Sequence, residues 1–273
     1  MTVLRPARRQ THRPAGKYGP RFSPVRNVLA LMLRETSTRY GRTPGGYLWS
    51  VLEPSAAILF LSLGFSLLLR SPSLGTSFIL FYSTGYLMYH MYNNLAGPIA
   101  QSITFSKPLL KFPVVNWLDA VIARFLLNSL TNLMICVLLF TIILNVVDNR
   151  TVLEFGPMVE AFILAMLLGL GVGVLNCVLI GLFPVWGIIW GIVNRPLFLA
   201  SGVIYIYEDL PKLAQDILWY NPLIHVTGLM RTGFYSTYSP TYISVTYVLV
   251  VSLMTVALGL MLMRRHHRSI LNF

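Results

Sequence analysis

Charged side chains are scarce in this sequence. Asp, Glu, Lys and Arg make up 11% of its 273 residues, of which only 9 are acidic, whereas 55% of the residues are hydrophobic. A water-soluble protein of this length needs more polar surface than such a composition supplies. The composition therefore excludes a soluble globular domain and indicates that lipid is the main solvent.

Motifs for catalysis and nucleotide binding are also missing. The sequence holds no Walker A pattern, zinc-type His pair, nucleophile elbow or aspartate-rich diphosphate site. Its two cysteines, Cys136 and Cys177, lie in apolar segments, where a packing role is favoured. Gly169, Gly171 and Gly173 lie in an apolar segment with no strand before them, which favours close helix packing. We therefore expect a non-enzymatic protein that itself binds no metal and no cofactor.

Long apolar segments dominate the chain. A helix needs about 20 apolar residues to cross a hydrocarbon core about 30 Å thick. Such segments lie at 48–69, 77–97, 117–145, 158–182, 184–206 and 241–263. The turn near Pro184 carries no charge, so the fourth and fifth segments are either two helices or one bent element. The sequence predicts an all-α, polytopic membrane protein with six transmembrane helices.

Positive charge gathers at both ends of the chain. Of the 21 Lys and Arg residues, 10 lie in residues 1–42, and Arg264, Arg265 and Arg268 lie close to the last residue. Because cytoplasmic loops and tails carry an excess of Lys and Arg, both termini are expected in the cytoplasm. Residues 1–24 hold too few large apolar side chains to fold alone, which predicts a disordered basic cytoplasmic arm.

Two segments outside the spans have a mixed character. Residues 25–41 begin with apolar side chains and end with polar ones, which predicts an N-terminal amphipathic helix at the membrane interface. Residues 207–240 are too polar for a simple span but rich in Tyr, Trp and Leu. They predict short periplasmic re-entrant or interfacial helices before the last span.

Some polar side chains fall inside the spans, where a charge costs about 2.5–3.5 kcal/mol at the bilayer centre. Glu53 and Arg124 lie at a similar depth, which predicts a salt bridge between them. Arg124 also begins a polar row with Asn128, Thr131 and Asn132, whose spacing places them on one helical face toward the bundle or a subunit interface. The row either contacts cargo or only links helices.

Two other features have both a transport and a structural interpretation. Arg195 lies near the middle of the fifth span, where it either attracts anionic cargo or bonds helix carbonyls beside Pro196. Tyr82, Tyr86 and Tyr89 form a stripe on the second span. The stripe either offers sliding contacts to sugars or packs in the core.

Three strings resemble a known family. They are residues 33–41 (LRETSTRYG) with 46–56 (GYLWSVLEPSA), residues 221–226 (NPLIHV), and residues 122–124 (IAR). These strings and the order of the spans resemble permease subunits of type-2 ABC exporters, above all those of bacterial capsule polysaccharide export (KpsM-like). The resemblance covers residues 25–270, which implies a single ABC transporter transmembrane domain over that range.

The resemblance implies an assembly and roles for particular segments. Two permeases form a homodimer above two cytoplasmic ATPase subunits, which hold the ATP and Mg. Residues 25–41 match the gate helix and 101–112 the coupling helix, and both lie against the ATPase. Residues 209–236 match two short helices at the outer exit. The implied coupling residues are Arg34, Glu35, Arg39, Gln101, Phe105 and Lys107, and the implied structural residues are Glu53, Pro54, Asn221 and Pro222.

The implied function is export of lipid-linked acidic capsular polysaccharide across the bacterial inner membrane, with a periplasmic adaptor and an outer-membrane channel as further partners. The expected substrate path includes Tyr82, Tyr86, Tyr89, Arg124, Asn128 and Arg195. O-antigen, teichoic-acid and small-molecule exporters share the same plan and stay open as alternatives. A membrane-embedded glycan-modifying enzyme is a further alternative, for which Glu208 and Asp209 are the nearest acidic pair.

Overall fold

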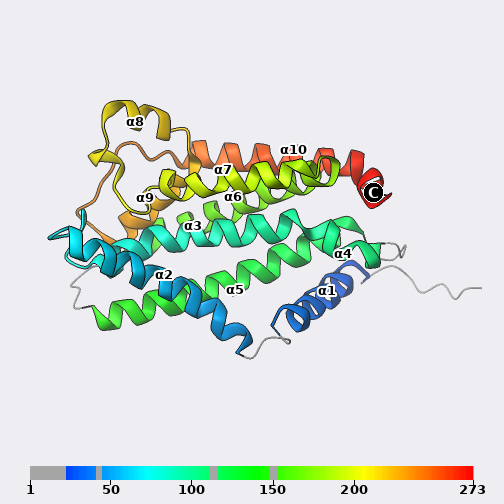
Figure 1. The fold of residues 1–273 in the computed structure, drawn as a ribbon, viewed down its shortest axis with the longest axis horizontal. Helices are drawn as coiled ribbons and strands as arrows, with labels where there is room; N and C mark the ends of the chain where they lie inside the picture. Colours follow the sequence, from blue (N-terminus) through cyan, green and yellow to red (C-terminus); the bar gives the residue numbers. More distant parts are fainter. Residues whose placement is uncertain (1–22, 41–44, 111–115, 148–152, 273) are drawn as a thin grey trace, which may run out of the picture.

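The structure is a computed structural model that describes residues 23–40, 45–110, 116–147 and 153–272, and these residues form helices without a strand. Figure 1 shows most of the long helices running side by side in one elongated bundle. The elements are α1 (Ser23–Tyr40), α2 (Gly46–Leu68), α3 (Phe78–Ala100), α4 (Ser102–Leu110), α5 (Trp117–Val146), α6 (Phe155–Leu182), α7 (Val185–Ala200), the short 3-10 helix η1 (Tyr207–Asp209), α8 (Lys212–Leu218), α9 (Pro222–Phe234) and α10 (Val245–Asn272).

The bundle is organised around α3 and α6. Helix α6 packs most extensively against α10 and α3, while α3 also contacts α2, α5 and α9. Gly169 and Gly173 face Leu95 and Ile99 of α3, whereas Gly171 faces α10. The predicted packing role of these glycines is confirmed, because their missing side chains let α6 approach a helix on each side.

Among the residues that the structure describes, four helices are long and apolar enough to cross a membrane, namely α2, α5, α6 and α10. These confirm four of the predicted segments as candidate spans. Helix α10 begins later than the predicted segment and continues past residue 263 through the basic residues to Asn272. Its last turns remain helical because Ile270 packs with Ile103 of α4 and Met263 in an apolar cluster.

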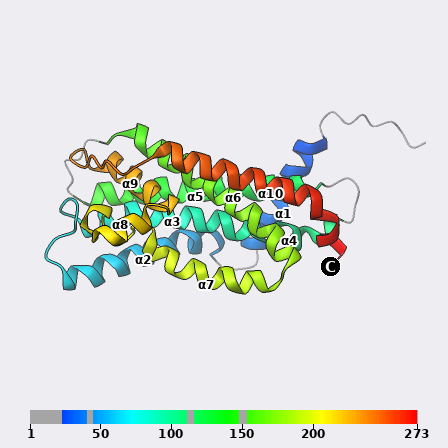
Figure 2. The same ribbon diagram turned by 90° about the horizontal axis from the view of Figure 1, so that it is seen from above.

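The second and fifth predicted spans are helices of a different kind. Helix α3 has 23 residues, of which 15 are buried within the chain, including polar ones such as Ser83 and His90. A helix surrounded by other helices does not need an apolar exterior. Helix α7 has 16 residues and ends at Ala200, short of the predicted residue 206, and none of its residues is buried. It is separate from α6, and the chain reverses direction at Pro184 (Figure 2).

The two ends of the bundle differ. Helices α1 and α4 lie at the same end as the C-terminus, and α8 and α9 lie at the opposite end (Figure 1). The helix expected over 25–41 coincides with α1, the one expected over 101–112 with α4, and the pair expected over 209–236 with α8 and α9. Most of the predicted basic arm, residues 1–22, lies outside the described residues.

The glycine contacts predict a difference between two substitutions in α6. A Cβ at Gly173 would lie 2.8 Å from Ile99 Cβ and 3.1 Å from the Ala96 carbonyl oxygen, whereas a Cβ at Gly156 would have no atom within 4 Å. We therefore expect Gly173→Ala to lower the unfolding temperature of the detergent-purified protein by several degrees, since α3 and α6 must separate. Gly156→Ala is the control and should leave it unchanged. Equal unfolding temperatures would contradict this account of the packing.

Candidate functional site

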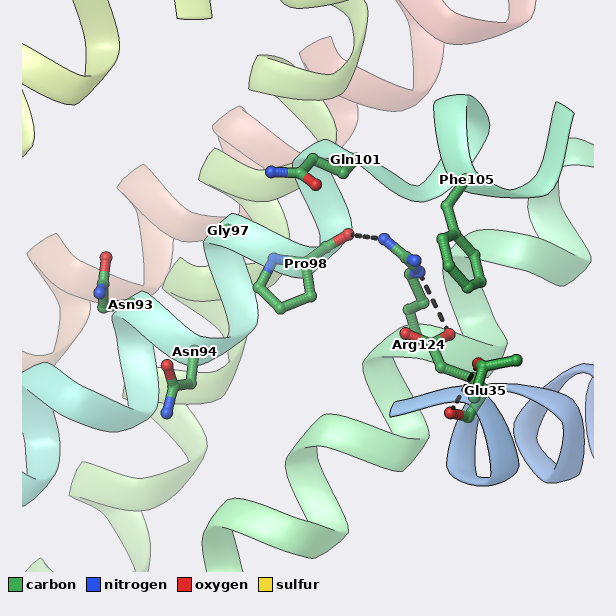
Figure 3. Close-up of a pocket in the computed structure, with 9 residues that line it drawn as sticks. Glu35, Asn93, Asn94, Gly97, Pro98, Gln101, Phe105 and Arg124 are labelled. Carbon is green, nitrogen blue, oxygen red and sulfur yellow. Dashed lines mark hydrogen bonds and ion pairs between the residues drawn. The ribbon is translucent and has the colours of Figure 1, made fainter. Parts of the chain in front are cut away.

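Arg124 of α5 joins three helices where α1, α3 and α5 meet. The residue is only 5% exposed. Its Nε donates a hydrogen bond to Glu35 Oε2 of α1 at 3.1 Å, and its Nη1 donates to the Pro98 carbonyl oxygen in the last turn of α3 (Figure 3). A buried guanidinium needs both a counter-charge and acceptors for its remaining N–H groups. Glu35 and Pro98 supply these from two other helices.

Phe105 brings α4 into the same cluster. The Arg124 guanidinium lies 4.5 Å from the centroid of the Phe105 ring, and the Arg34 guanidinium lies 5.4 Å from it. Each contact at such a site stabilises by about 0.5–2 kcal/mol through the electron-rich ring face. The ring is still 41% exposed. Phe105 therefore connects α4 to α1 and α5 while keeping an accessible surface.

Most of the implied coupling residues meet in this cluster. Arg34, Glu35 and Phe105 contact one another or Arg124, and Gln101 lines the adjoining cavity. Lys107 lies farther along α4 and is half-buried. The side chain of Arg39 lies outside the described residues.

The predicted salt bridge between Glu53 and Arg124 is wrong. Arg124 forms its ion pair with Glu35, and Glu53 is an exposed residue of α2. The prediction compared only how deep Glu53 and Arg124 lie in their spans. It could not take into account that α1 packs against α5. Asn27 of α1 contacts Asp119 of α5 through Nδ2 and Oδ2 at 3.5 Å, which shows the same approach of the two helices.

The polar row of α5 lies inside the bundle, as predicted. Asn128 Nδ2 donates to the Arg124 carbonyl oxygen at 2.7 Å, and Asn132 Nδ2 donates to the Asn128 carbonyl oxygen at 2.8 Å. From α3, Asn94 Nδ2 lies 3.4 Å from Asn132 Oδ1 and 2.8 Å from His90 Nε2. The row, with the buried Thr131, thus forms a polar seam between α3 and α5.

The tyrosine stripe of α3 is partly covered within the chain. Tyr86 and Tyr89 meet the Phe198 ring of α7 edge-on, and the Tyr89 hydroxyl donates to the Asn194 carbonyl oxygen at 3.3 Å. Tyr82 is 1% exposed and lies among the rings of Phe65, Phe78 and Phe81. These contacts use much of the stripe for packing, and a role in a cargo path stays a prediction.

The remaining predicted residues lie apart from the cluster. Arg195 is exposed on α7, and Pro54 is buried inside α2. Asn221 caps α9 by accepting from the Leu223 N–H at 3.1 Å, and its Nδ2 donates to the Ala200 carbonyl oxygen at 2.8 Å. Pro222 occupies the first turn of α9, where a missing N–H costs nothing. The Asn221–Pro222 pair therefore starts α9 and ties it to the end of α7.

Arg231 of α9 is a buried residue that sequence reasoning missed. It is 1% exposed and lies 4.3 Å from the centroid of the Phe81 ring of α3. Its Nη1 and Nη2 donate to the carbonyl oxygens of Tyr205 and Val203 at 2.7 and 3.1 Å. Arg231 thus fastens the connection after α7 to α3 and α9. The available signal was a lone cation in the mostly apolar sequence of α9.

A cavity of about 480 Å³ lies beside Arg124. Figure 3 shows the labelled side chains around it, which come from α1, α3, α4 and α5. Among the described residues, no group of three His, Cys, Asp or Glu side chains is placed to hold a metal ion. The lining residues are Glu35, Thr38, Asn93, Asn94, Gly97, Pro98, Gln101, Phe105 and Arg124.

Removing one partner of the Arg124–Glu35 pair should destabilise the protein more than removing both. Glu35→Leu or Arg124→Leu alone leaves a buried charge uncompensated, at a cost of about 3–5 kcal/mol. The double variant removes both charges, so its loss of thermal stability should be clearly smaller than the sum of the two single losses. Glu160→Leu, at an exposed position of α6, is the control. Strictly additive losses would rule out the pair as an energetic unit.

Comparison with known proteins identifies the family. A sequence profile of the family described as ABC-2 type transporter matches residues 26–235. The chain is 30% identical over 246 residues to the polysialic acid transport protein KpsM of Escherichia coli, covering 89% of this chain and 95% of that protein. It is 30% identical over 247 residues to the capsule polysaccharide export inner-membrane protein BexB of Haemophilus influenzae, covering 90% of this chain and 92% of that protein.

The capsule polysaccharide export inner-membrane protein CtrC of Neisseria meningitidis is similar as well, at 27% identity over 247 residues, with 90% of this chain and 92% of that protein covered. These relatives confirm the resemblance to capsule export permeases that the three sequence strings indicate. The profile spans most of the described bundle, from α1 to the end of α9. The chain belongs to the ABC-2 type transporter family.

Proposed function

We propose that this chain is the permease subunit of an ATP-driven exporter that moves lipid-linked acidic capsular polysaccharide across the bacterial inner membrane. The observation that carries the proposal is the match, along about nine-tenths of the chain, to relatives named for polysialic acid transport and for capsule polysaccharide export. The enzyme alternative finds little support, because Glu208 accepts a hydrogen bond from the Tyr238 hydroxyl at 2.9 Å and so has a structural use.

In this proposal α3 and α7 cross the membrane together with the four apolar helices, which gives six spans. The 23 residues of α3 extend about 35 Å, enough for the hydrocarbon core. The 16 residues of α7 extend about 24 Å, and the connection that follows it would complete the crossing. An even number of spans keeps both termini in the cytoplasm, with α1 and α4, and places α8 and α9 as re-entrant helices at the periplasmic side.

The proposed assembly is a homodimer on two cytoplasmic ATPase subunits, which bind ATP and Mg. Supporting this, α7 has no residue buried within its own chain, and α2 has only three. Facing copies of such surfaces would enclose a path, to which Arg195, Tyr86, Tyr89 and Asn128 contribute. A periplasmic adaptor and an outer-membrane channel would receive the polymer.

The Arg124 cluster supports a proposed route from ATP hydrolysis to the path. Helix α4 is joined to α3 through Gln101 alone and contacts Arg124 through Phe105. Motion of α4 under the ATPase would therefore shift α1 and α5 at the same time. Arg34, Glu35 and Phe105 would serve as positioning residues for this movement.

Export should depend on this chain and on ATP hydrolysis by its partner. We expect deletion of the permease gene in the source bacterium to leave capsular polysaccharide inside the cell, and re-expression to restore it at the surface. An ATPase partner that binds but cannot hydrolyse ATP should block export to the same degree. Surface polysaccharide measured by immunoblot and by electron microscopy is the readout. Undiminished export with the inactive ATPase would overturn the mechanism.

Phe105→Ala should separate ATP turnover from transport. The substitution removes the ring that both Arg34 and Arg124 contact but leaves the Arg124–Glu35 ion pair. In proteoliposomes with the ATPase, we expect at least a tenfold fall in polysaccharide exported per ATP hydrolysed, with ATP turnover largely kept. Phe155→Ala, on an exposed face of α6, should behave like the parent protein. Equal export per ATP in both variants would contradict the coupling role.

A further inference from the structure

The cavity beside Arg124 has unused hydrogen-bonding capacity. We call it the amide pocket, after its three carboxamide residues Asn93, Asn94 and Gln101. Asn93 Oδ1 accepts from Asn194 Nδ2 at 2.8 Å. Among the residues that the structure describes, the Asn93 amino group donates no hydrogen bond. Asn94 uses its amino group toward His90 and Asn132, and within the described residues its Oδ1 accepts no hydrogen bond. Gln101 is exposed, and its carboxamide makes no hydrogen bond to any residue that the structure describes.

The charges lining the amide pocket compensate each other. Arg124 and Glu35 are paired at 3.1 Å, and the guanidinium also bonds the Pro98 carbonyl oxygen. The other polar lining groups are carboxamides and the hydroxyl of Thr38, all uncharged. A site for phosphate or another anion would need a cation whose charge is not compensated. The pocket therefore favours an uncharged polar ligand.

The ligand chemistry follows from donors and acceptors that lie close together. A carboxamide offers both, as does a sugar hydroxyl, and each good hydrogen bond contributes about 0.5–1.5 kcal/mol. The volume of about 480 Å³ lies within the usual range of about 300–1,000 Å³ for small-ligand sites. A single sugar unit with several hydroxyls matches both the chemistry and the size.

Gly97 keeps the pocket open. It lines the cavity, and a Cβ built on it would meet no atom within 4 Å. Gly97 is also exposed. Close helix packing therefore does not account for a glycine at this position, and a side chain here would project into space that a ligand needs.

A second, smaller cavity lies next to the amide pocket, between α2, α3 and α5. It has a volume of about 50 Å³ and shares Asn94 with the amide pocket. Its lining is again polar, with Ser50 and Glu53 from α2 and Asn128 and Asn132 from α5. Polar groups thus lead from the end of the bundle that holds α1 and α4 toward its middle.

We infer that the amide pocket is a binding site for one uncharged, hydroxyl-bearing sugar unit of the exported polymer, held at the entrance of the path by Asn93, Asn94 and Gln101. The inference rests on the proposed function and adds a ligand class and a location to it. Binding is by hydrogen bonds alone, with no covalent step. The site differs from the tyrosine stripe in using carboxamides rather than aromatic faces.

Filling the pocket should block transport without disturbing the fold. In the permease-deletion strain of the source bacterium, we expect Gly97→Leu to lower surface polysaccharide at least tenfold. Gly156→Leu is the matched control, because a Cβ at Gly156 of α6 also meets no atom within 4 Å. The amount of protein in the membrane and its unfolding temperature should be the same for both variants. Equal export by both would overturn the inference.

Photo-crosslinking tests the contact directly, with the native polymer as the probe. A benzophenone amino acid at Thr38, which lines the amide pocket without being one of its carboxamides, should yield a permease–glycan adduct, detected by antibody to the polysaccharide, only in cells that make the polymer. Gly97→Leu should abolish the adduct, and the same probe at Met261, 69% exposed on α10, should give none. No adduct at position 38 in exporting cells would refute the site. If export in the parent strain does not depend on ATP hydrolysis by the partner ATPase, the proposed function is refuted instead.

Discussion

A guanidinium buried among helices constrains the end of the bundle that holds α1 and α4. Arg124 cannot leave its N–H groups unbonded or its charge uncompensated in a medium with little water. Its partners come from α1, from the last turn of α3 and from the ring of Phe105 on α4. One side chain therefore fixes the relative positions of four helices, two of which, α1 and α4, are proposed to contact the ATPase.

The end of the bundle that holds α8 and α9 has a similar arrangement with different partners. Arg231 bonds two carbonyl oxygens of the connection after α7 and lies against Phe81. Asn221 ties the start of α9 to the end of α7. Irregular backbone at a membrane boundary needs such partners because lipid supplies none. The two arginines thus hold the two ends of the bundle, while the glycines of α6 set the close packing between them.

The sequence predicted where the helices lie along the chain better than it predicted the contacts between them. Apolar length located α2, α5, α6 and α10. A mixed apolar and polar composition located α1 and the α8–α9 pair, and the family resemblance located α4. The periodicity of Arg124, Asn128 and Asn132 correctly placed them inside the bundle. The partner of Arg124 was mispredicted, because depth along a span does not say which helix lies alongside. Arg231 was missed for a related reason, since its acceptors are main-chain carbonyls that no side-chain pattern marks.

The single-residue link between α3 and α4 has a mechanical consequence. Only Gln101 separates the two helices, its N–H bonds the Pro98 carbonyl oxygen, and its own carbonyl oxygen accepts from Phe105. A link of one residue held by two backbone hydrogen bonds allows little independent movement of α3 and α4. Helix α3 therefore acts as a stiff rod about 35 Å long, and a small tilt imposed where it meets α4 would move its opposite end, where it contacts α9.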